Sequence, residues 1–310
     1  MSETITIVTA CDNAYAQHAS VFLRSLFVQN SDACFRIFII VPDNFVHHEA
    51  IERTVGAHNA CVQFLSVAAN DIGPVKITHY VTTASYFRLL VGSLLPDHVE
   101  RIIFFDPDIV INGPIRELWD IDLQDQVLAA AVDVTQNPLI HARLELSATS
   151  QYFNSGVLVI NLRRWKTDRI GEQALEFALR FPERISLSEQ CALNHVLDGD
   201  FKKLPEHWNF QMGRLPATDR RKYAEACRSL RSAAVIHFSG RRKPWLYLSN
   251  HPMKWLYWKY LRQTEWRSYR PPDRNLRNVG RRIIWSLSLN APALLAAMRR
   301  VRSLWRPSVG

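Results

Sequence analysis

The sequence lacks the glycine-rich signatures of the common nucleotide-binding loops. Its 310 residues contain 11 glycines, with no G-x-G-x-x-G after the first apolar segment and no G-x-x-x-x-G-K-[ST] anywhere. Ordinary dinucleotide-binding and phosphate-loop folds are therefore poor interpretations. Internal repeats and low-complexity segments are absent as well. A chain of this length is expected to form one large domain with an appendage.

Cysteines are few, and long apolar runs are missing. The five cysteines are scattered, odd in number and free of C-x-x-C spacing, which predicts reduced thiols in a cytosolic protein. No apolar run reaches the roughly 18 residues expected of a membrane span. The N-terminal MSE lacks the positive segment of a signal peptide, so no secretory leader is expected.

Acidic residues are scarce at the C-terminal end. From residue 262 onward there are eleven arginines, no lysine and two acids, Glu265 and Asp273, which together account for the whole net charge of +9. Removing this segment from the totals of 38 basic and 29 acidic residues leaves 27 of each. The composition therefore predicts a formally neutral domain at 1–261 and a basic tail at 262–310.

Short apolar segments alternate with helical ones over the first 110 residues. Strands are expected at 4–10, 35–41, 60–66 and 101–105, with helices near 17–28 and 45–57. This alternation predicts an α/β fold with a mostly parallel sheet that is covered on both faces. Ligands bind such sheets beyond the carboxyl ends of the strands. Asp12 follows the first strand and Asp106 the fourth, so both are expected at the binding edge.

Two aspartates follow the fourth strand in the segment RIIFFDPDIVI. Asp106 and Asp108 lie at i and i+2 in extended backbone, so both carboxylates can point the same way and hold one hard divalent cation. Such a cation could bridge to a diphosphate. Asp-Pro-Asp is also ordinary turn chemistry. The pair alone does not separate a metal site from a surface turn.

Five segments in this order resemble a known family. They are IVTACDNAYAQHASVFLRSL (7–26), RIIFFDPDIVI (101–111), YFNSGVLVINLRRW (152–165), LSEQCALNHVL (187–197) and HFSGRRKPW (237–245). The chain is similar to the retaining nucleotide-sugar glycosyltransferases of family eight, which include glycogenin and bacterial lipopolysaccharide galactosyl- and glucosyltransferases. The resemblance covers the chain from about residue 4 to about residue 258. It implies a single GT-A-like nucleotide-sugar-binding domain, followed here by a helical basic tail.

The resemblance implies a metal site. Family members bind manganese through the two aspartates of a D-x-D pair and a histidine in H-x-x-G-x-x-K-P-W, which correspond to Asp106, Asp108 and His237. Mn²⁺ accepts carboxylate and imidazole ligands together, and Mg²⁺ is an alternative. The metal would neutralise charge on the departing nucleoside diphosphate. A histidine at a strand end can otherwise be an ordinary core residue.

Three residues are implied at the diphosphate. Lys243 matches the family lysine that meets the phosphates, and Gly240 would let the backbone approach them closely. Arg88, in TTASYFRLLVGSLLP, matches an arginine near the donor sugar and diphosphate. An arginine on an otherwise apolar helix needs a partner. The alternatives are a solvated lysine and a purely structural ion pair.

At the nucleotide end, Asp12 matches an aspartate that faces the uridine, and Tyr15 could stack on the uracil. Many relatives read D-D-N-Y where this chain has Asp12, Asn13 and Ala14 before the tyrosine. The amide before the tyrosine is therefore lost unless Asn13 replaces it. A core role for Tyr15 is the alternative.

Four residues are implied around the donor sugar. Asn154 matches a residue that hydrogen-bonds sugar hydroxyls, and Asp133 matches a sugar- or acceptor-contacting aspartate, with a turn-capping role as the alternative. In SEQCALN, Gln190 is kept, whereas Glu189 and Cys191 replace the two aspartates of the family's DQDALN. The longer Glu189 should change how donor hydroxyls are bound.

The implied reaction is transfer of a hexosyl unit from a UDP-sugar to a hydroxyl of a glycan or lipid-linked glycan, with retention of configuration. Lys243, Arg88 and the metal would assist departure of UDP. A two-step route needs a nucleophile near the anomeric carbon, for which Gln190 and Glu189 are candidates. A same-face displacement needs none. The rival from another class is a non-catalytic nucleotide-sugar or glycan binder with the same fold.

The basic tail is expected to bind membranes rather than nucleic acid. Helices are expected at about 281–289 and after Pro292, and one face of the second helix would carry Leu294, Met298, Val301 and Trp305, with arginines on the flanks. Such a helix suits the headgroup region of an anionic leaflet. The predicted location is cytoplasmic and peripheral, on the inner face of the cell membrane, near a lipopolysaccharide-like acceptor. Docking of this helix on the protein's own core is the alternative.

Overall fold

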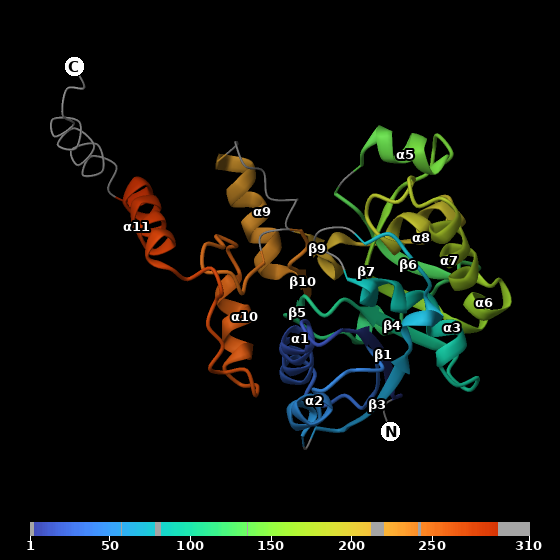
Figure 1. Ribbon diagram of the computed structural model, residues 1–310, viewed down its shortest axis with the longest axis horizontal. Helices are drawn as coiled ribbons and strands as arrows, with labels where there is room; N and C mark the ends of the chain where they lie inside the picture. Colours follow the sequence, from blue (N-terminus) through green and yellow to red (C-terminus); the bar gives the residue numbers. More distant parts are fainter. Residues whose placement is uncertain are drawn as a thin grey trace.

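The computed structural model describes residues 3–56, 58–77, 82–134, 136–211, 220–240 and 243–290. A seven-stranded sheet in the order β3-β2-β1-β4-β7-β6-β8 forms the centre of this part of the chain (Figure 1). Its strands are β1 (Ile5–Ala10), β2 (Phe35–Pro42), β3 (Ala60–Val67), β4 (Arg101–Phe105), β6 (Leu128–Val132), β7 (Phe153–Asn161) and β8 (Lys202–Leu204). Only β7 runs antiparallel to its neighbours. The predicted mostly parallel sheet is confirmed.

A second, three-stranded sheet lies at the carboxyl ends of the central strands. It has the order β5-β10-β9 and consists of β5 (Ile109–Ile111), β9 (Phe210–Gln211) and β10 (Val235–His237). β10 pairs antiparallel with β5 and parallel with β9. Because β5 follows β4 after three residues, this small sheet holds the chain beyond the D-x-D pair.

Helices cover both faces of the central sheet. They are α1 (Ala16–Gln29), α2 (His48–Val55), α3 (Val91–Leu94), α4 (Arg116–Trp119), α5 (Pro138–Leu144), α6 (Leu162–Thr167), α7 (Ile170–Arg180), α8 (Glu189–Leu197), α9 (Arg220–Ser232), α10 (Lys254–Leu261) and α11 (Leu276–Asn290), with 3₁₀ helices η1 (Ala69–Asp71), η2 (Thr83–Leu90) and η3 (Glu206–Trp208). Successive strand residues alternate between two cores. Ile7 and Ile103 face α1, α2 and α4, whereas Val8 and Phe104 face η2 and α6–α8.

A third core joins the C-terminal part of the chain to this body. Leu256, Tyr257 and Leu261 of α10 pack against Val21 of α1 and Ile236 of β10. In Figure 1, α10 lies beside α1 and α11 projects beyond it, away from the sheet. No helix among the described residues is long and apolar enough to cross a membrane.

The tail helix begins earlier than expected. α11 starts at Leu276, whereas the sequence predicted a helix from about residue 281. Asn275 caps it, because its side-chain oxygen accepts from the backbone N–H of Asn278 at 2.9 Å. The predicted second amphipathic helix, with Leu294 and Trp305, lies outside the described residues. The boundary at 262 stays a prediction.

Candidate active site

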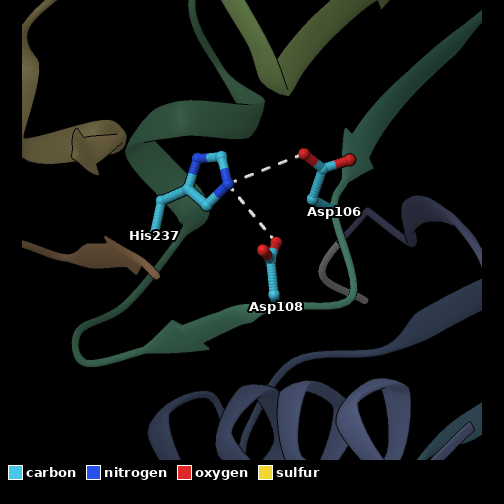
Figure 2. Close-up of side chains that lie close together, drawn as sticks. All are labelled: Asp106, Asp108 and His237. Carbon is cyan, nitrogen blue, oxygen red and sulfur yellow. Dashed lines mark ion pairs between the residues drawn. The ribbon is translucent and has the colours of Figure 1, made fainter. Parts of the chain in front are cut away.

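Three side chains converge at the carboxyl edge of the central sheet (Figure 2). Asp106 and Asp108 follow β4, and His237 ends β10. Nε2 of His237 lies 3.6 Å from Oδ2 of Asp106 and 3.3 Å from Oδ1 of Asp108. One ligand atom of each residue lies within 4.8 Å of the other two. The fold thus brings His237 beside the D-x-D pair, although it lies 129 positions after Asp108 in the sequence. The sequence predicted this grouping.

Backbone pairing and a missing side chain set this arrangement. The N–H of Asp106 donates to the carbonyl of Gly156 at 2.8 Å, and His237 is paired with Ile109 across β5 and β10. A Cβ on Gly156 would lie 2.3 Å from Cε1 of His237 and 2.9 Å from Oδ2 of Asp106. Only glycine therefore allows the imidazole and the carboxylate to lie over this part of β7.

Each aspartate is bonded to a cation through its other oxygen. Oδ1 of Asp106 accepts from Arg88 Nη2, and Oδ2 of Asp108 accepts from Lys243 Nζ. The oxygens that remain, Oδ2 and Oδ1 respectively, are the two that face His237. Burial disfavours ionisation of Asp108, but the charged and hydrogen-bonding groups around it, the Lys243 ammonium foremost, together hold the pKa of this carboxyl well below its usual range.

Arg88 has the partners that its apolar surroundings require. It lies in the 3₁₀ helix η2, is 3% exposed and stacks over the Phe104 ring at 4.6 Å. Its Nε lies 2.9 Å from Oε1 of Glu189, and its Nη1 donates to the carbonyl of Ser155. Burial opposes the charge of Arg88, but Asp106 and Glu189 raise its pKa overall. Arg88 therefore links the metal side of the site to α8.

A buried amide network lies on the other side of Arg88. Nδ2 of Asn154 donates to Oδ2 of Asp133 at 2.9 Å and to Oε1 of Gln190 at 3.1 Å. Nε2 of Gln190 donates to the same Asp133 oxygen at 3.2 Å, and its Oε1 accepts from the N–H of Ser155 at 3.0 Å. The sugar-side residues predicted from β7 and α8 therefore belong to one hydrogen-bond network.

Glu189 begins α8 as a buried carboxylate. It is 3% exposed and accepts from Oγ of Ser155 at 3.1 Å as well as pairing with Arg88. Burial raises the pKa of Glu189, and the Arg88 charge offsets part of that rise. Ser188, just before it, has φ +54° and ψ −144°, a conformation costly for a residue with a Cβ. Its Oγ lies 2.8 Å from Oγ of Ser85.

Asp12 and Tyr15 lie between β1 and α1, and Oδ1 of Asp12 accepts from the N–H of Tyr15 at 3.0 Å. The Tyr15 ring meets Trp245 edge-on at 6.0 Å. Burial raises the pKa of the Tyr15 hydroxyl, and the Lys243 ammonium offsets part of that rise. Asn13 bonds to the backbone of Asn44 and Val46.

The loop that follows His237 is held from two directions. Gly240 has φ +77° with open space around it, and Lys243 Nζ also donates to the carbonyl of Phe238 at 3.0 Å. Trp245 stacks on His18 of α1, with ring centroids 3.5 Å apart. Burial disfavours the charge of Lys243, but Asp108 and the other groups around the ammonium together raise its pKa. The neighbouring arginines of this loop, 241 and 242, lie outside the described residues.

Sequence reasoning missed Asn209. It follows η3, is 0% exposed and bonds to both Asn154 and His237. Nothing in its surroundings, PEHWNF, separates it from an ordinary turn asparagine. Ser155 was not predicted as a site residue either, although its backbone and hydroxyl bond to Arg88, Gln190 and Glu189.

Comparison with known proteins agrees with this geometry. The profile of glycosyl transferase family 8 matches residues 6–249. The chain is 28% identical over 288 residues to general stress protein A of Bacillus subtilis, covering 88% of this chain and 98% of that protein. It is 24% identical over 279 residues to the lipopolysaccharide 1,2-glucosyltransferase of Escherichia coli, covering 88% and 82%.

Solved structures show the same fold. The galactosyltransferase LgtC, crystallised with donor and acceptor sugar analogues, superimposes with a TM-score of 0.75 at 22% identity, covering 85% of this chain and 99% of that one. The resemblance of the five motifs to family eight is thereby confirmed. The family profile spans most of the chain and every motif of the site, so the chain belongs to glycosyl transferase family 8 and is a glycosyltransferase.

Proposed function

We propose that the protein transfers a hexosyl unit from a UDP-sugar to a hydroxyl of a glycan acceptor, using a divalent cation and retaining the configuration of the donor. The observation that carries this proposal is the convergence of Asp106, Asp108 and His237 at the carboxyl edge of the sheet, flanked by the cationic side chains of Arg88 and Lys243. Nucleotides bind at this edge in α/β folds.

The donor set fits Mn²⁺, with Mg²⁺ as the alternative. Asp106 Oδ2, Asp108 Oδ1 and His237 Nε2 would hold the ion, because these three atoms face one another. The imidazole nitrogen favours Mn²⁺ over Mg²⁺, because Mg²⁺ prefers an all-oxygen ligand set. When bound, the metal would supply positive charge against the diphosphate of the departing UDP.

Lys243 and Arg88 would stabilise the same leaving group. The side chains of Arg88 and Lys243 are 4% and 15% exposed, and ion pairs hold both beside the carboxylates. Cations fixed in a dry site can stabilise developing phosphate charge without costly reorganisation. Gly240, which has a positive φ and no atom of the described residues within 4 Å of where a Cβ would lie, would leave room for the diphosphate over the loop. Asp12 and Tyr15 would line the uridine end.

Retention by same-face displacement suits the sugar side. A covalent route needs a free nucleophile, yet Glu189 is held by Arg88 and Ser155. The Gln190 amide is bonded to Ser155 and Asp133. These contacts support a mechanism in which the acceptor hydroxyl attacks from the face that UDP leaves. Glu189 and Asp133 would then contact donor hydroxyls, with Asn154 orienting Asp133.

A donor panel tests this proposal. UDP release should be measured over several UDP-hexoses with Mn²⁺, with and without glycan acceptors, and the early product examined by NMR. We expect turnover with one UDP-hexose and a product that keeps the donor's anomeric configuration. Preference for a GDP- or CMP-sugar would contradict the proposed UDP-hexose donor, and a product of inverted configuration would contradict the proposed retention. Tight UDP-sugar binding without turnover would favour the non-catalytic rival.

We also propose that the tail attaches the enzyme to the inner face of the cell membrane, beside a lipid-linked acceptor such as a lipopolysaccharide core. Leu276, Ile283 and Ile284 of α11 are 92%, 55% and 48% exposed, and Arg277 and Arg281 are exposed beside them. Exposed apolar residues interleaved with arginines fit an anionic membrane surface.

Point substitutions test attachment better than truncation does. A chain ending at Pro272 would also lose Asp273, whose carboxylate accepts from the backbone N–H groups of Tyr247 and Leu248 at 2.6 and 3.0 Å. We expect the double variant Ile283→Glu, Ile284→Glu to bind anionic vesicles several-fold more weakly than the wild type. Val46→Glu, at a 73% exposed residue of the body, is the matched control. Equal flotation of all three proteins would contradict the anchor.

A further inference from the structure

Asn209 lies between the two sides of the site and touches both. It is 0% exposed and follows η3, with its N–H bonded to the carbonyl of Glu206 at 3.1 Å. One end of its amide lies 2.8 Å from Oδ1 of Asn154, and the other lies 2.9 Å from Nδ1 of His237. A fully buried amide with both ends bonded has one orientation, and that orientation determines what its neighbours must do.

The orientation of Asn154 is fixed first. Its Oδ1 faces the backbone N–H of Gly156 at 3.0 Å, and a backbone N–H can only donate. Its Nδ2 faces an oxygen of Asp133 at 2.9 Å and the Gln190 carbonyl oxygen at 3.1 Å, which both accept. The atom of Asn154 that meets Asn209 is therefore an acceptor.

Asn209 must then present its Nδ2 to Asn154 and its Oδ1 to His237. An amide oxygen cannot donate, so Nδ1 of His237 carries the proton in that contact. In the neutral ring, Nε2 is left with its lone pair. This is the atom that lies 3.6 Å from Oδ2 of Asp106 and 3.3 Å from Oδ1 of Asp108. Three lone pairs therefore face one another where a metal cation would bind.

We infer that Asn209 is a positioning residue, which sets His237 in its Nδ1–H form and so presents Nε2 for metal binding. This inference rests on the proposed metal dependence. Hydrogen bonds of this kind orient the ligand imidazole, and their loss weakens metal affinity by about 10- to 100-fold. Because the same amide donates to Asn154, the metal ligand and the sugar-side network are joined through one buried side chain.

Two substitutions separate this role from a merely structural one. Asn209→Leu removes both bonds while keeping the branching and the number of side-chain heavy atoms. Asn209→Asp loses the donor to Asn154 but keeps an oxygen for the Nδ1–H of His237. Mn²⁺ affinity, measured by EPR of free Mn²⁺, should fall about 10-fold or more in the Leu variant and be preserved in the Asp variant. Asn30→Leu, a buried asparagine at the far end of α1, is the control for general destabilisation.

Nitrogen NMR of the metal-free wild type gives a readout that does not depend on the variants. In spectra recorded at a pH where the His237 ring is neutral, its resonances, assigned by their loss in His237→Asn, should report the Nδ1–H form. The Nε2–H form would overturn the inference. Equal loss of Mn²⁺ affinity in Asn209→Leu and Asn209→Asp, or unchanged affinity in Asn209→Leu, would also overturn it. If the wild type itself binds no Mn²⁺, the proposed metal dependence fails instead.

Discussion

The two sides of the site differ in how their polar atoms are paired. On the metal side, acceptor atoms of Asp106, Asp108 and His237 face one another, with ion pairs only behind them. On the sugar side, Asn154 and Gln190 bond to Asp133 and to each other. The metal side is arranged to gain a cation. The sugar side keeps its shape through its own hydrogen bonds.

This difference has a consequence for stability. A ligand that binds only the folded state raises the unfolding midpoint by mass action. Substitutions on the metal side should therefore remove the stabilisation that Mn²⁺ provides. Substitutions on the sugar side should lower the stability of the metal-free protein and leave the Mn²⁺ effect in place.

The largest expected effect is that of Asp108→Asn. An amide at this position is a poor metal ligand, so UDP-sugar turnover should fall on the order of 1,000-fold, because the metal contributes several kcal/mol to leaving-group stabilisation. Mn²⁺ should no longer raise the unfolding midpoint. Asp125→Asn, an exposed carboxylate before β6 at the opposite edge of the sheet, should behave as the wild type. Normal turnover by Asp108→Asn would contradict the claim that the metal side of the site holds a catalytic cation.

Lys243→Ala should separate leaving-group stabilisation from metal binding. Loss of a fixed cation near the diphosphate should lower kcat about 100-fold. The ammonium of Lys243 is bonded to Asp108 and competes with a metal for its negative charge. Removing the ammonium should therefore not weaken Mn²⁺ binding. Calorimetric titration with Mn²⁺ and steady-state kinetics measure the two effects, with Lys259→Ala on the exposed side of α10 as the control. A loss of Mn²⁺ affinity as large as that of Asp108→Asn would argue against separate roles.

Gln190→Ala tests the sugar side. The N–H of Ser155 would lose the oxygen it donates to, and Asn154 would lose one of its two acceptors. Leaving such buried groups unpaired should lower the free energy of unfolding by about 2 kcal/mol. Chemical denaturation measures this change, and the upward shift of the midpoint with Mn²⁺ should persist. A variant as stable as the wild type would show that the network does not hold the site.

The smallest effect concerns the aromatic support of the Lys243 loop. Burial lowers the pKa of His18 from 6.5 to about 3, so the folded protein holds this residue neutral. The stability this gives is complete above the unfolded pKa and is lost as pH falls below it. Between neutral pH and about pH 5.5 the wild type should lose about 1 kcal/mol more than His18→Gln. Parallel denaturation curves at both pH values would contradict this.

The sequence-based predictions succeeded where a short segment carries its own geometry. Strands expected at 4–10, 35–41, 60–66 and 101–105 match β1 to β4 within one or two residues. Asp106 and His237 come together because strand ends meet at one edge of a sheet. His237 was predicted as a metal ligand only through the family resemblance, because its local sequence alone did not distinguish it from a core histidine.

What the sequence did not predict depends on contacts between distant segments. Asn209 acts only because η3 brings it between β7 and β10, and no local pattern marks it. The amide of Asn154 was expected at sugar hydroxyls, yet both its Nδ2 and Oδ1 already bond to protein groups. Whether it also meets the sugar stays a prediction, as do the roles of Asp12 and Tyr15.

Metal dependence of UDP release is the most direct test of the account. The protein should be treated with EDTA, exchanged into metal-free buffer and assayed with its preferred UDP-hexose before and after Mn²⁺ is restored. We expect no turnover without the metal, recovery on adding Mn²⁺, and no recovery in Asp108→Asn. Full turnover in EDTA would contradict the claim that Asp106, Asp108 and His237 hold a catalytic cation.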